Sequence, residues 1–157
     1  MKVEFINPFV SAAFMVLEKV GKTKVTKGAL SLASSPIAGM DVNTVIGVTG
    51  DILGQVIYSM STDTAQKLAS VMLMGLPISD FDEIAKSAIS ELGNIITGNA
   101  ATELGNNGFC CNITPPSLFM GKEVKVSIKD LQILVIPVTT DLGEIHIYVA
   151  LREVDRQ

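Results

Sequence analysis

The chain has 157 residues, a formal net charge of −4, a pI of about 4.9 and a mean hydropathy of +0.44. This length predicts a single domain, residues 1–157, whose core folds without disulfides or structural metal. The basic residues are scattered singly, which argues against a nucleic-acid partner. No apolar run reaches the roughly 18 residues of a membrane span, and the N-terminus does not resemble a signal peptide. We therefore expect a cytoplasmic protein without a membrane partner.

Side chains that usually serve as nucleophiles or metal ligands are scarce. The two cysteines, Cys110 and Cys111, are adjacent and too close for an unstrained disulfide, so we interpret them as buried, reduced thiols. One histidine, His146, without CxxC or HExxH spacing, leaves too few ligands for zinc. Strand alternation places His146 on the face opposite its isoleucine neighbours, which favours an outward-facing residue over a catalytic base. We expect no metal or cofactor bound by this chain alone.

The first half of the chain contains one helix and a hairpin. A helix is predicted from Pro8 to about Val20, with Asn7 as its N-cap. A short alternating stretch, residues 29–33, predicts an edge or connecting strand. Residues 42–49 and 53–60 are rich in β-branched side chains and flank a Gly-Asp turn, which predicts a β-hairpin.

Two further helices and three strands are predicted after the hairpin. Capping residues at 61–63 precede a helix over 64–74, and Ser79 and Asp80 are expected to cap a helix from about Asp82 to about Leu104. Residues 114–116, Thr-Pro-Pro, should be extended. Strands are predicted at 124–128, 132–139 and 144–152, where Pro137 should exclude its strand from the middle of a ladder or mark a bulge.

The order helix, strands, hairpin occurs twice, over residues 8–60 and 82–152. This repetition predicts an internally duplicated α-β-β arrangement. We therefore expect an α+β fold of two layers, with three main helices packed on an antiparallel or mixed sheet of five to six strands.

Polar residues line one face of the third predicted helix. Glu91 and Asn94 are three residues apart, so they share a face, which extends back to Ser87 and forward to Gly98. Spacing alone is more typical of a solvated helix face. Gly98 is either a packing notch against the sheet or part of the site. An apolar arc beside this face is expected to cover the sheet: Ile84, Ala88, Ile89, Leu92, Ile95 and Ile96.

The chain resembles the CheX group of the CheC/CheX/FliY family, chemotaxis phosphatases that dephosphorylate the response regulator CheY. Ser87, Glu91 and Asn94 match the family pattern of Asp or Ser, three residues, Glu, two residues, Asn. Pro115 and Pro116 follow where the family places a proline, and residues 44–50 with 54–59 resemble its central hairpin. The agreement in order, spacing and length covers essentially the whole chain.

The resemblance implies a substrate, a division of roles and a dimer. The substrate would be the aspartyl phosphate of a response regulator that carries its own Mg²⁺. Asn94 would orient the attacking water, Glu91 would pair with a lysine of the regulator, and Ser87 would support them. Members pair as homodimers through their sheets, and the strand of Pro137 or the segment near Ala29 could form that edge.

Two alternatives and one additional motif stay open. The chain could be a noncatalytic module that binds a response regulator, as flagellar switch proteins do, or a CheX-like domain of a two-component system unrelated to chemotaxis. Glu4 and Asn7 repeat the ExxN spacing, but Pro8 follows at once, so Glu4 is expected to precede the helix. We interpret Glu4 and Asn7 as degenerate or capping residues rather than a second site.

Overall fold

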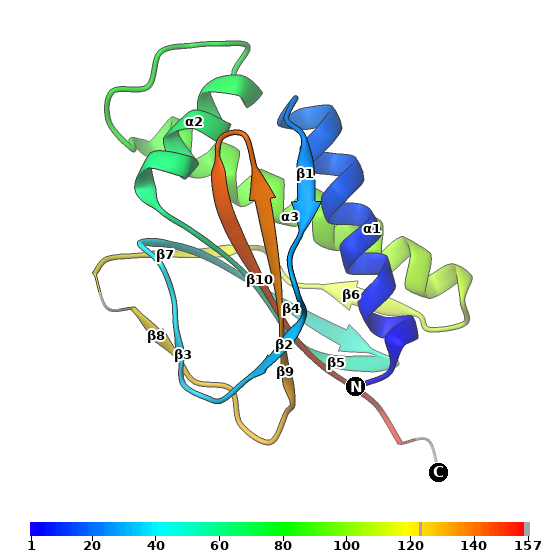
Figure 1. The fold of residues 1–157 in the computed structure, drawn as a ribbon. Coiled ribbons are helices and arrows are strands. Elements are labelled where there is room, and N and C mark those ends of the chain that lie inside the picture. The colour runs from blue at the N-terminus through cyan, green and yellow to red at the C-terminus, as the bar shows by residue number, and fades with distance from the viewer. Residues whose placement is uncertain (123, 156–157) are drawn as a thin grey trace.

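The computed structural model describes residues 1–122 and 124–155, in which three helices cover one face of an antiparallel sheet (Figure 1). The helices are α1 (Val3–Val20), α2 (Thr62–Met72) and α3 (Glu83–Asn106). The strands are β1 (Val25–Lys27), β2 (Ser31–Ala33), β3 (Ile37–Ala38), β4 (Val42–Gly50), β5 (Ile52–Met60), β6 (Cys111–Ile113), β7 (Ser117–Met120), β8 (Lys125–Val126), β9 (Ile133–Thr140) and β10 (Gly143–Glu153).

Eight of the described strands form the main sheet, in the order β1-β9-β10-β5-β4-β6. The short strand β2 also pairs with β9, and β7 also pairs with β4, so each outer position is shared by two short strands. All pairings are antiparallel, and β3 pairs with β8 in a separate ribbon. The prediction of an α+β fold with three helices on an antiparallel sheet is confirmed, whereas the sheet has eight described strands instead of the five to six expected.

The two halves of the chain repeat one arrangement. In the first half α1 is followed by β1, β2, β3 and the hairpin β4–β5, and in the second half α3 is followed by β6, β7, β8 and the hairpin β9–β10. The hairpins meet through β5 and β10, while the short strands of each half border the hairpin of the other. This symmetry supports the predicted duplication, with α2 as the connecting element.

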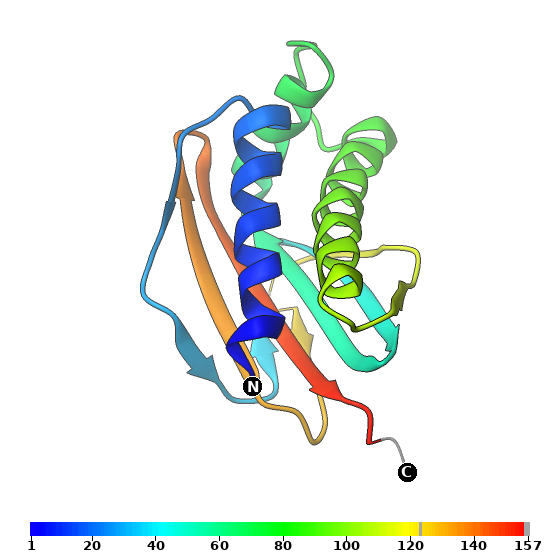
Figure 2. The same cartoon turned by 90° about the vertical axis from the view of Figure 1, so that its right-hand side faces the viewer.

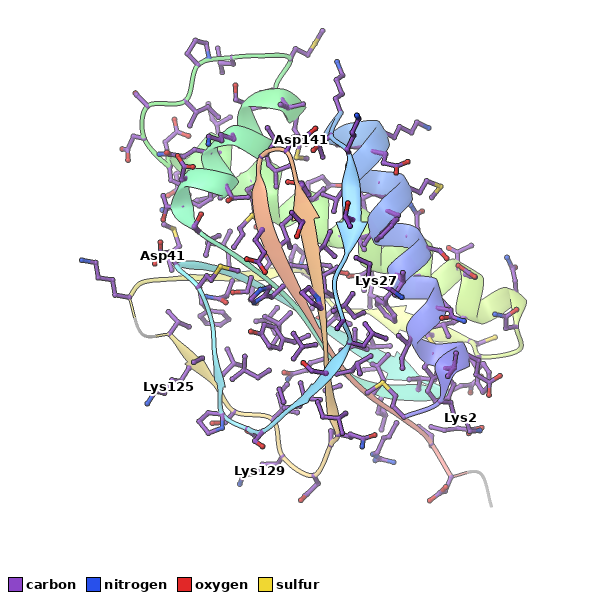
Figure 3. All side chains as sticks on the ribbon, viewed as in Figure 1. Lys2, Lys27, Asp41, Lys125, Lys129 and Asp141 are labelled. Atoms are coloured by element: carbon purple, nitrogen blue, oxygen red, sulfur yellow. The ribbon has the colours of Figure 1, made fainter. Side chains whose placement is uncertain are left out.

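The sheet separates two apolar clusters. On one face, α1 and α3 lie side by side and α2 covers one end of the layer (Figure 2), enclosing the larger core. The opposite face carries a smaller cluster that includes Ile37 of β3 and Tyr148 of β10. Figure 3 shows Lys125 and Lys129 at β8 and the segment that follows it, apart from Lys2 and Lys27. No helix within the described residues is long and apolar enough to cross a membrane.

The start of α1 differs from the prediction. The helix begins at Val3, not Pro8, and its N-cap position is Lys2, so Asn7 is not a cap. Phe5 is buried in the core, and its burial extends the helix through the residues that precede the proline. Pro8 is tolerated because its missing N–H removes only the hydrogen bond to the carbonyl of Glu4, near the helix end.

The cap of α3 also differs from the prediction. The N-cap is Asp82, whose carboxylate Oδ1 accepts a hydrogen bond from the Ala85 amide at 2.9 Å. Ser79 and Asp80 precede it in the connecting segment. The cap of α2 lies where expected, since the Ser61 hydroxyl accepts from the Thr64 amide at 3.1 Å.

The local residue pattern predicted the short outer strands of the sheet least well. The segment predicted at 124–128 is a strand only over β8, and β1, β3, β6 and β7 were not predicted. Of the two alternatives for Pro137, exclusion from the middle of the ladder was wrong, because β9 has neighbours on both sides. The bulge is confirmed: between the pairs Lys27–Val138 and Ser31–Val135, residues 28–30 lie opposite residues 136–137. Pro137 lies between the stretches that pair with β1 and β2, where its carbonyl accepts from the Gly28 amide at 2.8 Å.

Asp82→Ala should lower the free energy of unfolding by about 1 kcal/mol, because it removes the cap of α3. Asp80→Ala is the matched control and should change it by less than about 0.5 kcal/mol. Urea denaturation followed by circular dichroism measures both. Equal losses in the two variants would contradict the assignment of Asp82 as the cap.

Candidate functional site

An open groove runs between α3 and the segment that contains β7. Ser87 and Glu91 lie on its α3 side, and Pro116 lies on the other. The remaining lining residues are Glu83, Lys86, Ser90, Leu118 and Met120. The tertiary structure thus brings Ser87 and Glu91 together with one of the prolines noted in the sequence. Asn94 is not part of the lining and lies on the next turn of α3.

The side chains of Glu91 and Asn94 are available to a partner molecule. Glu91 is exposed and Asn94 is half-buried. Within residues 1–122 and 124–155, neither side chain has a hydrogen bond or an ion pair. The nearby ammonium of Lys86 is 3.2 Å from the carboxylate of Glu83. A carboxylate and a carboxamide on one helix face can therefore bind a cation and a hydrogen-bonding group together.

The buried side of α3 is rotated from the predicted apolar arc. Ile84 was expected to cover the sheet, but 58% of it is exposed, and Ile95 is half-buried. Small and polar residues take part in the contact instead, because they let the helix backbone approach its neighbours closely. The buried residues of α3 are Ala85, Ala88, Ile89, Leu92, Gly93, Ile96, Thr97, Ala100 and Leu104.

Gly93, between Glu91 and Asn94, is where α3 meets the β4–β5 hairpin. A Cβ atom at this position would lie 3.1 Å from Cγ2 of Thr44 and 3.2 Å from Cδ2 of Tyr58. Both distances are shorter than ordinary van der Waals contacts between carbon atoms. The absence of a side chain therefore sets how closely this turn of the helix rests on the sheet.

A chain of buried hydroxyl groups joins the same turn to β5. Thr97 Oγ1 donates to the Gly93 carbonyl at 2.8 Å, and the Tyr58 hydroxyl is 2.8 Å from Thr97 Oγ1. Since Thr97 gives its one hydroxyl hydrogen to Gly93, Tyr58 is the donor in the second bond. Burial raises the pKa of Tyr58 above its ordinary value of 10.0, which keeps the phenol protonated and able to donate.

Sequence reasoning missed Gly93, Thr97 and Tyr58. The sequence does contain a signal for Gly93 and Thr97: a glycine and a threonine occupy the buried arc of a helix, where larger apolar residues are usual. Tyr58 gave no such signal, since its partner lies on another element that only the folded chain brings near.

Gly98 lies in a looser environment than Gly93. A Cβ atom there would be 4.0 Å from Cδ1 of Ile113, which is an ordinary contact, so Gly98 is not a tight packing notch. The Gly98 carbonyl accepts a hydrogen bond from Thr102 Oγ1 at 3.0 Å. Its part in the site stays a prediction.

The remaining sequence candidates lie outside the groove. Cys110 is exposed, which corrects the expectation of two buried thiols, while burial raises the pKa of the half-buried Cys111 thiol. His146 lies on the sheet face opposite the helices, with Nε2 2.8 Å from Oε1 of Glu144. In the part of the chain that the structure describes, no three His, Cys, Asp or Glu residues are arranged to hold a metal ion.

The two glycines should respond oppositely to alanine. Gly98→Ala should raise the free energy of unfolding by about 0.5–1 kcal/mol, because alanine is the better helix former and the space is open. Gly93→Ala should lower it by about 1–3 kcal/mol, because the new methyl group presses on Thr44 and Tyr58. Chemical denaturation of both variants measures the difference, and stabilisation by Gly93→Ala would contradict the close contact.

Comparisons with known proteins agree on one family. Residues 42–139 match the family described as "Chemotaxis phosphatase CheX". The CheY-P phosphatase CheX of Thermotoga maritima is 35% identical over 126 residues, which are 80% of this chain and 81% of that protein.

Solved structures extend the agreement to nearly the whole chain. A crystal structure of a CheX-CheY-BeF3-Mg²⁺ complex from Borrelia burgdorferi matches with a TM-score of 0.83 and 32% identity, covering 97% of this chain and 100% of that one. A chemotaxis protein CheX from Desulfovibrio desulfuricans matches with a TM-score of 0.86 and 26% identity over the same shares. The chain therefore belongs to the CheX family of chemotaxis phosphatases.

Proposed function

We propose that this phosphatase hydrolyses the aspartyl phosphate of a CheY-like response regulator with Asn94 and Glu91 as its acting residues. The observation that carries the proposal is the pair of unengaged polar side chains on the outer face of α3, whose inner face rests on the sheet. The CheX relative is named for CheY-phosphate, and the Borrelia complex contains CheY, which supports this substrate class.

Asn94 orients the attacking water. A carboxamide accepts and donates hydrogen bonds without titrating, so it can hold a water in line with the phosphorus atom without becoming a nucleophile itself. Asn94 is half-buried, which restricts the motion of the carboxamide and favours one direction of approach.

Glu91 anchors the regulator. Its exposed carboxylate can form a charge-assisted hydrogen bond with a lysine near the phosphorylated aspartate, and no cation of the described chain competes for it. Ser87, one turn earlier in the same groove, supports the contact through its hydroxyl group. The regulator supplies the Mg²⁺ and the phosphoryl group, and a cytoplasmic location follows from such a partner.

Asn94→Ala should reduce the accelerated dephosphorylation of a phosphorylated CheY-like regulator by about 100- to 1,000-fold, the usual effect of removing one positioned polar group. Affinity for the beryllofluoride-activated regulator should change little. Radiolabelled phosphate loss measures the rate, and surface plasmon resonance measures binding. Asn99→Ala is the matched control, because Asn99 is an exposed asparagine elsewhere on α3.

Glu91→Ala should weaken both binding and turnover in the same assays, because it removes the anchor and loosens the approach of Asn94. Glu103→Ala is the control on the same helix and should have no effect. Unchanged turnover in both Asn94→Ala and Glu91→Ala would reject these site residues. A wild-type chain that binds activated regulators and accelerates no dephosphorylation would favour the noncatalytic binding module.

We also propose a homodimer formed through the edge of the sheet at β2. The strand that contains Pro137 is interior, which leaves the segment near Ala29 of the two predicted edges. Leu32 of β2 is 64% exposed and Leu30 is 41% exposed, so burying them in a second copy would gain hydrophobic free energy.

Leu32→Glu should shift the protein from dimer to monomer in sedimentation equilibrium, because a carboxylate at the interface loses its hydration. Leu76→Glu is the control, since Leu76 is 52% exposed but lies after α2. A wild-type protein that sediments as a monomer at all concentrations tested would refute the dimer.

A further inference from the structure

The proposed roles of Glu91 and Asn94 do not explain the chain of buried hydroxyl groups beneath them. We propose that Tyr58 and Thr97 are positioning residues, which fix the peptide group that carries Asn94 and thereby set the rate of the chemical step. This inference rests on the proposed function of Asn94 and deepens it.

The geometry connects the two hydroxyl groups to Asn94 through a single peptide plane. The Gly93 carbonyl and the Asn94 amide belong to the same planar peptide group, so a hydrogen bond to that carbonyl also restrains the backbone of Asn94. Thr97 Oγ1 donates to the carbonyl, and the Tyr58 hydroxyl donates to Thr97. Strand β5 is thus linked through side chains to the peptide between Gly93 and Asn94.

The environment of the chain makes this restraint effective. Tyr58 is 3% exposed and Thr97 is fully buried, so water does not compete for either hydrogen bond. Thr97 bonds to the carbonyl four residues earlier, a contact that bends helices slightly and so affects the direction of the preceding turn. A displacement of about 1 Å in a catalytic group can cost on the order of 100-fold in rate.

The other half of the repeat lacks this chain of hydroxyl groups. Glu4 and Asn7 of α1 have the spacing of Glu91 and Asn94, and they are exposed on one helix face, contrary to the expectation that Glu4 precedes the helix. Counted from the glutamate, however, Ile6 replaces Gly93 and Val10 replaces Thr97.

The strands beneath the two helices differ in the same way. On the helix-facing side of β4–β5, Tyr58 pairs with Thr44, while Val149 pairs with Leu134 at the corresponding register of β9–β10. All positions that supply the hydroxyl chain under α3 are therefore apolar under α1. Burying polar atoms costs free energy. The hydroxyl chain lies beneath the proposed site and is missing from the corresponding positions under α1, which indicates a role at that site.

The test measures kcat and KM separately for dephosphorylation of a CheY-like regulator phosphorylated with acetyl phosphate. Tyr58→Phe and Thr97→Val should each lower kcat about tenfold and leave KM within about twofold, because binding by Glu91 is retained. Combining them should cost little more than either change alone, since both interrupt one chain. Thr97→Ser keeps the hydroxyl group and should restore kcat.

Thr102→Val is the matched control. It removes the same kind of hydrogen bond, from a threonine to the carbonyl four residues earlier, at the exposed end of α3. Its kcat should equal that of the wild type. All variants are assayed at a temperature at which circular dichroism shows them folded.

The outcomes separate this inference from the function on which it rests. Wild-type kcat in Tyr58→Phe and Thr97→Val, together with loss of activity in Asn94→Ala, would overturn the positioning role alone and leave the hydroxyl chain as ordinary core structure. Wild-type kcat in Asn94→Ala would overturn the proposed function and the positioning role together.

Discussion

The close contact between α3 and the β4–β5 hairpin at Gly93 is the constraint on which the site depends. Without a side chain at Gly93, the helix backbone rests on Thr44 and Tyr58. A close contact at one residue fixes the rotation of the helix about its own axis. This contact therefore determines which residues of α3 face outward. Glu91 and Asn94 flank the contact and therefore project on the open side, beside the groove that also contains Pro116.

The duplicated fold supplies two similar helices, but their supports differ. Both α1 and α3 lie on the same face of the sheet and carry a glutamate and an asparagine three residues apart. The hydrogen-bonded pair Thr97 and Tyr58 lies beneath α3, and the corresponding positions beneath α1, Val10 and Val149, are apolar. The two halves thus differ more in the residues buried beneath the helix than in the exposed glutamate and asparagine. The same motif on a helix face is therefore informative only together with the buried residues that hold the helix in place.

Sequence reasoning succeeded where local interactions decide structure. The β4–β5 hairpin was predicted from β-branched residues around a turn, and the cap of α2 from Ser61, because each signal acts within a few residues. It failed at the start of α1, where the local signal of Pro8 was outweighed by burial of Phe5 in a core formed by distant segments. The short outer strands were missed because pairing with a remote hairpin, rather than their own composition, makes them strands.

By itself the sequence determined the family resemblance, the duplicated order of elements and the shared face of Ser87, Glu91 and Asn94, since helical periodicity depends on spacing alone. Only the tertiary structure decided which face of α3 is buried. It left Ile84 exposed and selected Gly93 for the contact. It also brought Tyr58 to Thr97 across the core. These features depend on long-range packing, in which the neighbour of a residue is set by the whole fold rather than by adjacent positions in the chain.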